Sequence, residues 1–148
     1  MASLLGRIEE FTQEEAQVAL ELIDGSLAPS DDPFGYRCLV ALADEGEDAA
    51  LWGYLCYGRT PMTERAYDLY WVAVEPSLQG VGVGRRLCGA LEDTVREAGG
   101  GIIRVETSAQ EAYGKTVRFY QRIAYVEGGR LPDFYKPGDD LIVFYKWV

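Results

Sequence analysis

The sequence predicts one domain of the α/β class, built on a mixed sheet rather than on a fully doubly wound one. The chain has 148 residues, of which 48% are hydrophobic and 12% aromatic, and this is enough for a core of its own. A hairpin pattern comes first, and a strand–helix–strand crossover follows in the middle of the chain. Because no repeat or linker interrupts this order, we expect residues 1–148 to form a single domain.

The first half of the chain predicts a strand, a helix and a hairpin. Gly6–Phe11 has the pattern of a strand. Thr12 is expected to cap a helix, since Glu15 follows three residues later and apolar residues then recur at helical spacing. After a loop rich in Asp and Pro, two apolar runs at Tyr36–Ala43 and Leu51–Tyr57 are joined by an acidic turn, which is typical of a β-hairpin.

The second half alternates strands and helices. Tyr67–Val74 is rich in β-branched and aromatic residues and ends before Pro76. Apolar residues from Leu87 to Ala98 then indicate a helix, which Gly99–Gly101 closes. The remaining expected elements are a strand at Ile102–Thr107, a helix at Glu111–Ile123, a turn at Pro137–Gly138 and a last strand at Leu141–Trp147.

The charged residues and cysteines exclude several classes of function. With 14 Lys+Arg, 24 Asp+Glu and no His, the formal charge is −10. The lack of histidine excludes His-based triads and His metal sites, and the acidic charge argues against nucleic acid or an anionic membrane as partner. Cys38, Cys56 and Cys88 have no metal-binding spacing, so we predict no metal and reduced, mostly buried thiols in a cytoplasmic protein.

A glycine-rich loop between a strand and a helix is the most informative feature. Residues 79–85 read Gln-Gly-Val-Gly-Val-Gly-Arg. Glycines let the backbone approach a ligand, and free N–H groups at a helix N-terminus bind phosphate. Arg85 and Arg86 oppose the helix dipole unless an anion lies there; solvated arginines on an ordinary turn are the alternative. Because position 87 is Leu and no Lys-Ser/Thr follows, neither a dinucleotide fingerprint nor a P-loop fits.

This loop and the strand before it resemble the acetyl-CoA signature of the GNAT superfamily of N-acetyltransferases. Gln79-x-x-Gly82-x-Gly84 follows a strand that ends in Val72-Ala73-Val74. The resemblance covers nearly the whole chain and implies a three-layer domain around a mixed, mostly antiparallel sheet. It also implies that the amides of residues 79–84 hold the CoA pyrophosphate and that the main chain of the strand pairs with pantetheine. The implied acetyl-CoA contacts are Val72, Ala73, Val74, Gln79, Gly80, Val81, Gly82, Val83, Gly84 and Arg85.

Acetylation of an amine needs an acid for the departing thiolate and a base for the amine proton. By resemblance, Tyr120 is the acid; simple aromatic packing with Phe119 is the alternative. For the base, the resemblance points to Asp68, and a period of two places it on one strand face with Tyr70, Val72 and Val74. The alternatives are Glu64, Glu106 and water.

The acceptor is expected to be a cationic amine, on a small molecule or on a peptide or protein, which attacks acetyl-CoA directly in a ternary complex. Asp31–Phe34 and Asp133–Tyr135, together with Asp139 and Asp140, combine carboxylates with aromatic rings, although ordinary turn chemistry also explains them. Two other functions remain open: a non-catalytic acyl-CoA sensor and an acidic interaction protein.

Two further surfaces are expected to be of lesser consequence. Lys115, Arg118 and Arg122 recur on one face of the helix predicted at Glu111–Ile123, where a solvated face is favoured over contact with CoA phosphates. Phe144 and Trp147 fall on opposite faces of the last predicted strand and would allow a homodimer.

Overall fold

The structure is a computed structural model that describes residues 13–27, 35–43 and 50–148. The predicted strand Gly6–Phe11, the capping residue Thr12 and the acidic segment Asp31–Phe34 therefore lie outside the described residues. The elements expected in the described parts are present, with ends shifted by one to a few residues.

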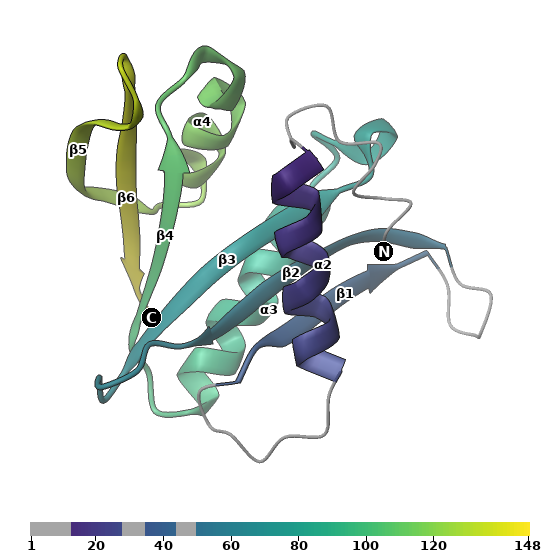
Figure 1. The fold of residues 1–148 in the computed structure, drawn as a ribbon. Coiled ribbons are helices and arrows are strands. Elements are labelled where there is room, and N and C mark those ends of the chain that lie inside the picture. The colour runs from purple at the N-terminus through teal and green to yellow at the C-terminus, as the bar shows by residue number, and fades with distance from the viewer. Residues whose placement is uncertain (1–12, 28–34, 44–49) are drawn as a thin grey trace.

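Six strands form one mixed sheet in the order β1-β2-β3-β4-β6-β5 (Figure 1). Neighbouring strands are antiparallel except for β3 and β4, which are parallel. The sheet thus consists of two antiparallel halves that meet at one parallel pair. The strands are β1 (Arg37–Leu42), β2 (Leu51–Arg59), β3 (Ala66–Val74), β4 (Ile102–Ser108), β5 (Val126–Lys136) and β6 (Asp139–Trp147).

Helices cover both faces of the sheet and give three layers. α2 (Gln13–Leu27) lies on one face of β1, β2 and β3, and α3 (Val83–Glu97) lies on the other (Figure 1). The short helix α4 (Gly114–Arg122) is on the α3 side and follows a 3-10 turn at Glu111–Tyr113, so the helix predicted at Glu111–Ile123 starts with a tighter turn than expected.

Two apolar cores follow from this layering. The larger one lies between the sheet and α3 and α4, and the smaller one lies beneath α2. The fully buried side chains of the larger core include Leu55, Leu91, Val95, Ile103 and Phe144, whereas Ala19, Ile23, Tyr54, Cys56 and Ala73 form the smaller core.

A buried charge pair fixes α3 and α4 to the sheet. Glu92 of α3 is 7% exposed, and both of its carboxylate oxygens accept hydrogen bonds of 2.8 Å from Lys146 Nζ of β6. The same ammonium group also donates to the carbonyl of Ile123, directly after α4. One lysine therefore joins three elements and holds the end of α4 against β6.

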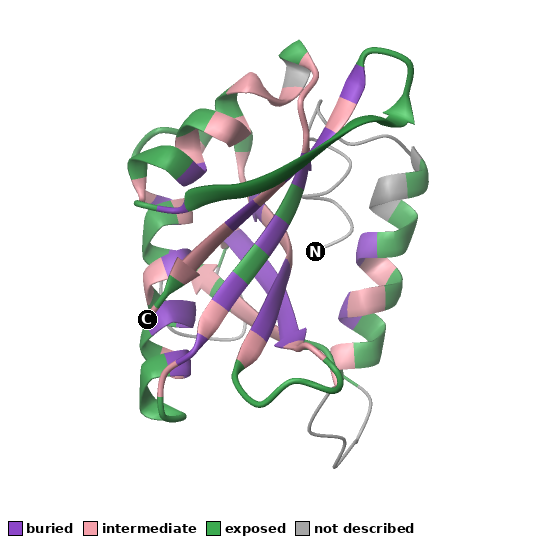
Figure 2. Ribbon diagram, turned by 90° about the vertical axis from the view of Figure 1, so that its left-hand side faces the viewer, coloured by how far each residue is buried: buried purple, intermediate pink, exposed green. Residues whose placement is uncertain are grey.

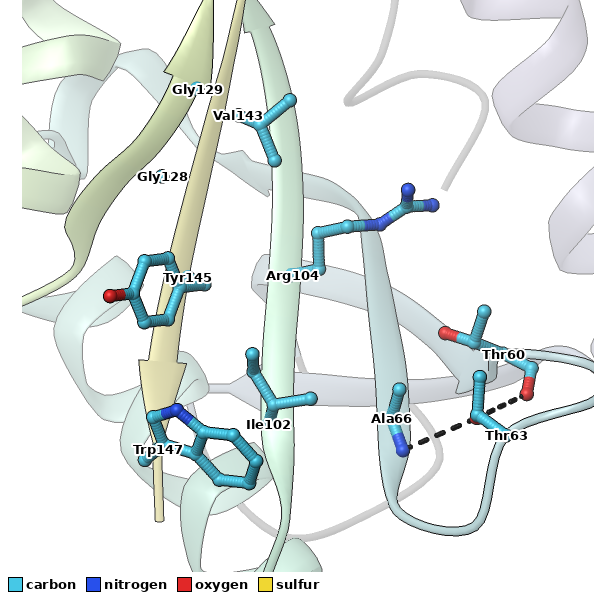
Figure 3. Close-up of a pocket in the computed structure, with 10 residues that line it drawn as sticks. All are labelled: Thr60, Thr63, Ala66, Ile102, Arg104, Gly128, Gly129, Val143, Tyr145 and Trp147. Atoms are coloured by element: carbon cyan, nitrogen blue, oxygen red, sulfur yellow. Dashed lines mark hydrogen bonds between the residues drawn. The ribbon is translucent and has the colours of Figure 1, made fainter.

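β5 forms the edge of the sheet opposite to β1, and β6 lies next to it. β5 is exposed along its whole length (Figure 2). A hollow of about 650 Å³ on the sheet face opposite α3 is lined by ten residues of this half and of the neighbouring turn (Figure 3). They are Thr60, Thr63, Ala66, Ile102, Arg104, Gly128, Gly129, Val143, Tyr145 and Trp147.

A β-bulge interrupts β3. On β2, Tyr57 pairs with Leu69 and the preceding Cys56 pairs with Trp71, so Tyr70 is an extra residue on β3. An extra residue reverses the side-chain alternation of the strand beyond it and increases its local twist.

The bulge corrects the predicted face of β3. Val72 and Val74 pack against the α3 core, whereas Tyr70 packs against the α2 core. Asp68 lies between two residues of the α3 core and so points to the α2 side. Asp68 thus shares a face with Tyr70 but not with Val72 or Val74, because strict alternation by two does not hold across a bulge.

Candidate active site

A wedge opens in the middle of the sheet between β3 and β4. The two strands pair only along Ala66–Asp68 and Ile102–Arg104. Beyond this point β3 stays paired with β2 and β4 with β6, so that β3 and β4 diverge (Figure 1). The edges of Leu69–Val74 and Val105–Ser108 that face each other therefore do not pair. Such an edge can bind an extended ligand through its main chain.

The glycine-rich loop lies where β3 ends and α3 begins. Gly80 and Gly82 have φ values of 83° and 99°, which favour glycine. No acceptor among the described residues takes a hydrogen bond from the N–H groups of residues 80–85; the first helical bond runs from the N–H of Arg86 to the carbonyl of Gly82. These groups form a row of free donors at a helix N-terminus, which is a site for an anion.

Arg85 and Arg86 extend this donor row with positive charge. Both are exposed in the first turn of α3, and neither forms an ion pair within the described part of the chain. The cations of the loop are therefore not neutralised by a partner among the described residues.

Gly84 packs the start of α3 against α4 and against the end of β3. A Cβ atom at this position would lie 3.3 Å from the ring of Phe119 on α4 and 3.6 Å from Val74 at the end of β3. Because glycine has no side chain, α3, α4 and β3 approach one another closely here. The donor row is therefore fixed beside the mouth of the wedge.

Tyr120 of α4 is buried on the α3 side of the wedge. The residue is 4% exposed, and its ring centroid lies 5.2 Å from that of Phe119, 5.6 Å from Tyr125 and 5.9 Å from Phe144. Phe144 pairs with Val105, the first residue of β4 that no longer pairs with β3. No hydrogen bond to the Tyr120 hydroxyl is formed within the described residues. Burial raises the pKa of Tyr120 above its usual value, so the hydroxyl is a proton donor at neutral pH.

Asp68 sits at the apex, in the last paired position of β3 and β4. Arg104 lies directly opposite and donates from Nε to Asp68 Oδ1 at 2.7 Å, and the hydroxyl of Thr60 donates to Oδ2 at 2.8 Å. Asp68 is 7% exposed. The hydrogen bond to Asp68 raises the pKa of Arg104. The apex thus holds a carboxylate with one strong donor on each oxygen.

The three carboxylates considered for the base differ in their surroundings. Glu106 lies 3.4 Å from Arg104 and shares that cation with Asp68, but its side chain is 43% exposed. Glu64 is exposed in the turn before β3. Asp68 is the buried member of the set.

Tyr70 lies near Asp68, and Tyr36, which the sequence analysis did not name as a site residue, packs against Tyr70. The rings of Tyr36 and Tyr70 meet edge to face, with centroids 5.2 Å apart. Burial raises the pKa of Tyr70, and the negative charge of Asp68 adds to this effect. A carboxylate next to aromatic rings is a suitable environment for a cation. Arg104 was also missed, because its pairing with Asp68 depends on a contact between strands 36 residues apart in the chain.

The acidic segment at the end of the chain has structural bonds. Asp133 accepts from the N–H of Gly138, and its own N–H donates to Asp140. Asp139 is 3% exposed and accepts from Ser108 and Gln110. The Asp133 bonds lie within the β5–β6 hairpin, in line with the alternative of turn chemistry, and those of Asp139 join the start of β6 to the end of β4. The basic residues of α4, Lys115, Arg118 and Arg122, are all exposed.

The described residues contain no group of three or more Cys, Asp or Glu side chains placed to hold a metal ion. None of the helices in the same residues has the length and apolarity that crossing a membrane requires.

Comparison with known proteins identifies the family. The sequence profile of the acetyltransferase (GNAT) family matches residues 5–125, and the chain belongs to this family. A crystal structure from Desulfovibrio desulfuricans, of a protein assigned to the GNAT acetyltransferases, has 40% identity and a TM-score of 0.87, covering 99% of this chain and 88% of that one. The predicted family and the mixed sheet of the predicted fold are thus confirmed.

Two further proteins are similar to this chain at lower identity. An aminoglycoside 6'-N-acetyltransferase crystallised with coenzyme A has 20% identity and a TM-score of 0.69, over 99% of this chain and 87% of that one, which shows the shared fold. An uncharacterised protein of Mycobacterium leprae is 31% identical over 100 residues, or 68% of this chain. These residues make up 26% of that protein, so the match spans about a quarter of its length.

Proposed function

We propose that the protein binds acetyl-CoA and transfers the acetyl group to an amine. The observation that carries this proposal is the row of free N–H donors at residues 80–85, fixed by Gly84 beside the mouth of an unpaired wedge. A pyrophosphate needs the donors, and an extended pantetheine arm needs the strand edges. The family and the coenzyme A in the aminoglycoside acetyltransferase structure support acetyl-CoA as the ligand.

The cofactor contacts follow from this placement. The main chain of Val72, Ala73 and Val74 on the edge of β3 would pair with pantetheine. The loop would hold the pyrophosphate through its amides, with Arg85 adding charge. The loop residues in this proposal are Gln79, Gly80, Val81, Gly82, Val83 and Gly84.

The transfer needs proton donors and acceptors on either side of the thioester. The amine nitrogen attacks the carbonyl carbon, the C–S bond breaks, and the thiolate leaves. We propose that Tyr120 protonates the thiolate sulfur and that Asp68 takes the amine proton, directly or through a water molecule. Each oxygen of Asp68 accepts one bond from the described residues and keeps capacity for a proton.

Direct attack is favoured over an acyl-enzyme. Burial raises the pKa of Cys88 to about 12, which leaves that thiol a poor nucleophile. Cys38 and Cys56 lie on β1 and β2 beneath α2, on the sheet face opposite the α3 core, and neither of these strands borders the wedge. Catalysis would then come mainly from positioning the amine against the thioester.

We propose a cationic amine as acceptor, on a small molecule or on a peptide or protein. Asp68 with Tyr36 and Tyr70 supplies a carboxylate beside aromatic rings on the α2 side of the apex. The net charge of −10 also attracts cations. A non-catalytic acyl-CoA sensor is the second candidate, and the free donor row favours it equally; the Tyr120 hydroxyl, for which a sensor has no use, favours the enzyme.

The test is release of free thiol from acetyl-CoA in the presence of a panel of amines, with acetyl-CoA binding measured in parallel by calorimetry. We expect binding, and turnover that is fastest with polyamines or lysine-like amines. The KM of these substrates should rise with salt, while that of a neutral amine should not. Binding without turnover on any amine would identify a sensor. Absence of binding would overturn the whole proposal.

Location and assembly are separate proposals. We propose a cytoplasmic location, because a reducing compartment preserves free thiols such as the three of this chain. A homodimer through the edge strand β5 and the exposed end of β6 is supported by the apolar side chains of Leu131 and Trp147, which are 51% and 61% exposed. Phe144, expected from the sequence to contribute, is fully buried and cannot do so.

A further inference from the structure

Cys38 of β1 and Cys56 of β2 are placed directly opposite each other. They are register partners in the antiparallel pair. Opposed residues in such a pair have Cα atoms about 4.5 or 5.5 Å apart. Disulfides span about 4.4–6.8 Å between Cα atoms, so both values are suitable. The backbone as folded therefore accepts a bond between these two sulfur atoms.

The two thiols differ in access. Cys56 is 0% exposed and belongs to the core beneath α2, whereas Cys38 is partly exposed at the rim of that core. An oxidant from solvent therefore reaches Cys38 first. Cys56 is sheltered behind it and in position to react with whatever forms on Cys38.

The same contact makes Cys38 the more reactive thiol. A hydrogen bond from Cys56 lowers the pKa of Cys38 to about 6, against the opposing effect of burial, and the Ser26 hydroxyl in the last turn of α2 adds to the lowering. The contact and burial raise the pKa of Cys56. Of the two thiols, Cys38 is therefore the one that ionises more readily, and Cys56 is the one that keeps its proton longer.

A spare hydrogen-bond donor lies beside the two sulfurs. Tyr54 is two residues before Cys56 on the same strand face, and its buried hydroxyl has no partner among the described residues. Its pKa is raised by burial and further by the charges of Cys38 and Cys56, which places it close to both. Buried polar groups without a partner are costly and call for an explanation.

We propose that Cys38 and Cys56 form a redox dithiol, which a peroxide converts into a cross-strand disulfide. The Cys38 thiolate attacks one peroxide oxygen and the O–O bond breaks, so that Cys38 becomes a sulfenic acid and the released hydroxide takes a proton from solvent to form water. The Cys56 sulfur then attacks the Cys38 sulfur and displaces the hydroxyl, which leaves as water with the Cys56 proton. The two thiols lose two protons and two electrons, and the peroxide becomes two waters. Tyr54 supplies a donor for the oxygen of the intermediate.

Cys88 is an internal control for this chemistry. It is 1% exposed on α3, and burial raises its pKa to about 12. Its position in the α3 core places the sheet between it and the other two cysteines. It should remain a thiol under conditions that oxidise the pair.

The experiment exposes the reduced full chain to hydrogen peroxide, alkylates it in denaturant and measures its mass. We expect a monomer that has lost two hydrogens, carries one alkyl group at Cys88 and is restored by dithiothreitol. Peptide mapping should join Cys38 to Cys56. The Cys88→Ser chain should lose the same two hydrogens, while in the Cys56→Ser chain dimedone should label Cys38 as a sulfenic acid.

Several outcomes would overturn the proposal. They are three alkylated cysteines after peroxide, oxygen added to Cys38 without loss of hydrogens, or a disulfide that includes Cys88 or joins two chains. The decisive measurement uses the unmodified sequence, so it does not depend on whether the variants fold. It is also independent of acetyl transfer, and its failure leaves the proposed function untouched.

Discussion

The polar groups that flank the wedge differ between its two sides: those on the α3 and α4 side have no partner within the described residues, whereas Asp68, Arg104 and Thr60 on the α2 side bind one another. The N–H groups of residues 80–85 and the Tyr120 hydroxyl belong to the first set. Asp68, Arg104 and Thr60 belong to the second, with bonds of 2.7 and 2.8 Å. Unpartnered donors mark a place where a ligand completes the hydrogen bonding.

The α2 side, which we call the paired side, has a structural role. An ion pair at the apex holds β3 and β4 together at the last position where they are bonded, and so fixes where the wedge begins. For Asp68 to accept a proton as well, it must do so while bound to Arg104 and Thr60. The α3 and α4 side, which we call the open side, has donors that await a ligand. On the paired side, the point to test is whether Asp68 accepts a proton or only anchors Arg104.

The largest effect is expected from Tyr120→Phe, on the open side. Removing the hydroxyl takes away the proposed acid, and kcat should fall about 100-fold or more. The KM for acetyl-CoA should not change, because the donor row at residues 80–85 remains. Steady-state kinetics with saturating amine measure both values.

Tyr125→Phe is the matched control for this change. Tyr125 is also buried in the α3 core, its ring lies 5.6 Å from that of Tyr120, and its hydroxyl has no partner in the described part of the chain. Its loss should leave kcat unchanged. Equal kcat values for the wild type and Tyr120→Phe would remove Tyr120 from the mechanism.

The second effect is expected from Asp68→Asn, on the paired side. If Asp68 takes the amine proton, kcat should fall about 100-fold, and the acidic limb of the pH–rate profile should disappear. Asn keeps the shape of the side chain and an oxygen for Arg104 or Thr60, and circular dichroism checks that the chain is folded.

Glu106→Gln separates Asp68 from its neighbour. Glu106 contacts the same arginine at 3.4 Å but is half exposed, so this variant should keep the acidic limb. If the limb survives in Asp68→Asn and vanishes in Glu106→Gln, Glu106 is the base. If it survives in both, Asp68 serves to anchor Arg104, and water removes the proton.

The open side could be predicted from the sequence because its signals are local. Three glycines and two arginines occupy seven consecutive positions, 80–86, and the strand and helix on either side have clear patterns. The free N–H groups follow from the start of a helix itself. The predicted loop and helix are accordingly found in the structure.

The paired side depends on contacts that a linear pattern does not contain. The bulge at Tyr70 reverses the strand alternation, and nothing in the residues of β3 alone marks it. The bond between Asp68 and Arg104 needs the parallel register of two strands that a whole helix separates in the chain. The opposition of Cys38 and Cys56 likewise depends on hairpin register, which turn length and pattern fix only together.

The smallest effect tests whether the donor row needs its backbone conformation. Gly82 has a φ of 99°, and a Cβ atom there would meet nothing within 4 Å. Alanine would therefore meet no steric obstacle but would cost about 1–2 kcal/mol in this conformation, or turn the amides away from the ligand. We expect Gly82→Ala to weaken acetyl-CoA binding about 10-fold in calorimetry, with kcat at saturation little changed.

Gly89→Ala supplies the matched substitution on the same helix. A Cβ atom at Gly89 also meets nothing within 4 Å, but this residue lies inside α3 without a positive φ. Alanine there should raise the free energy of unfolding by about 0.5–1 kcal/mol and leave acetyl-CoA affinity unchanged. Equal affinities in both variants would mean that the loop binds through Arg85 and Arg86 rather than through its amides. The free donors would then no longer distinguish the two sides of the wedge.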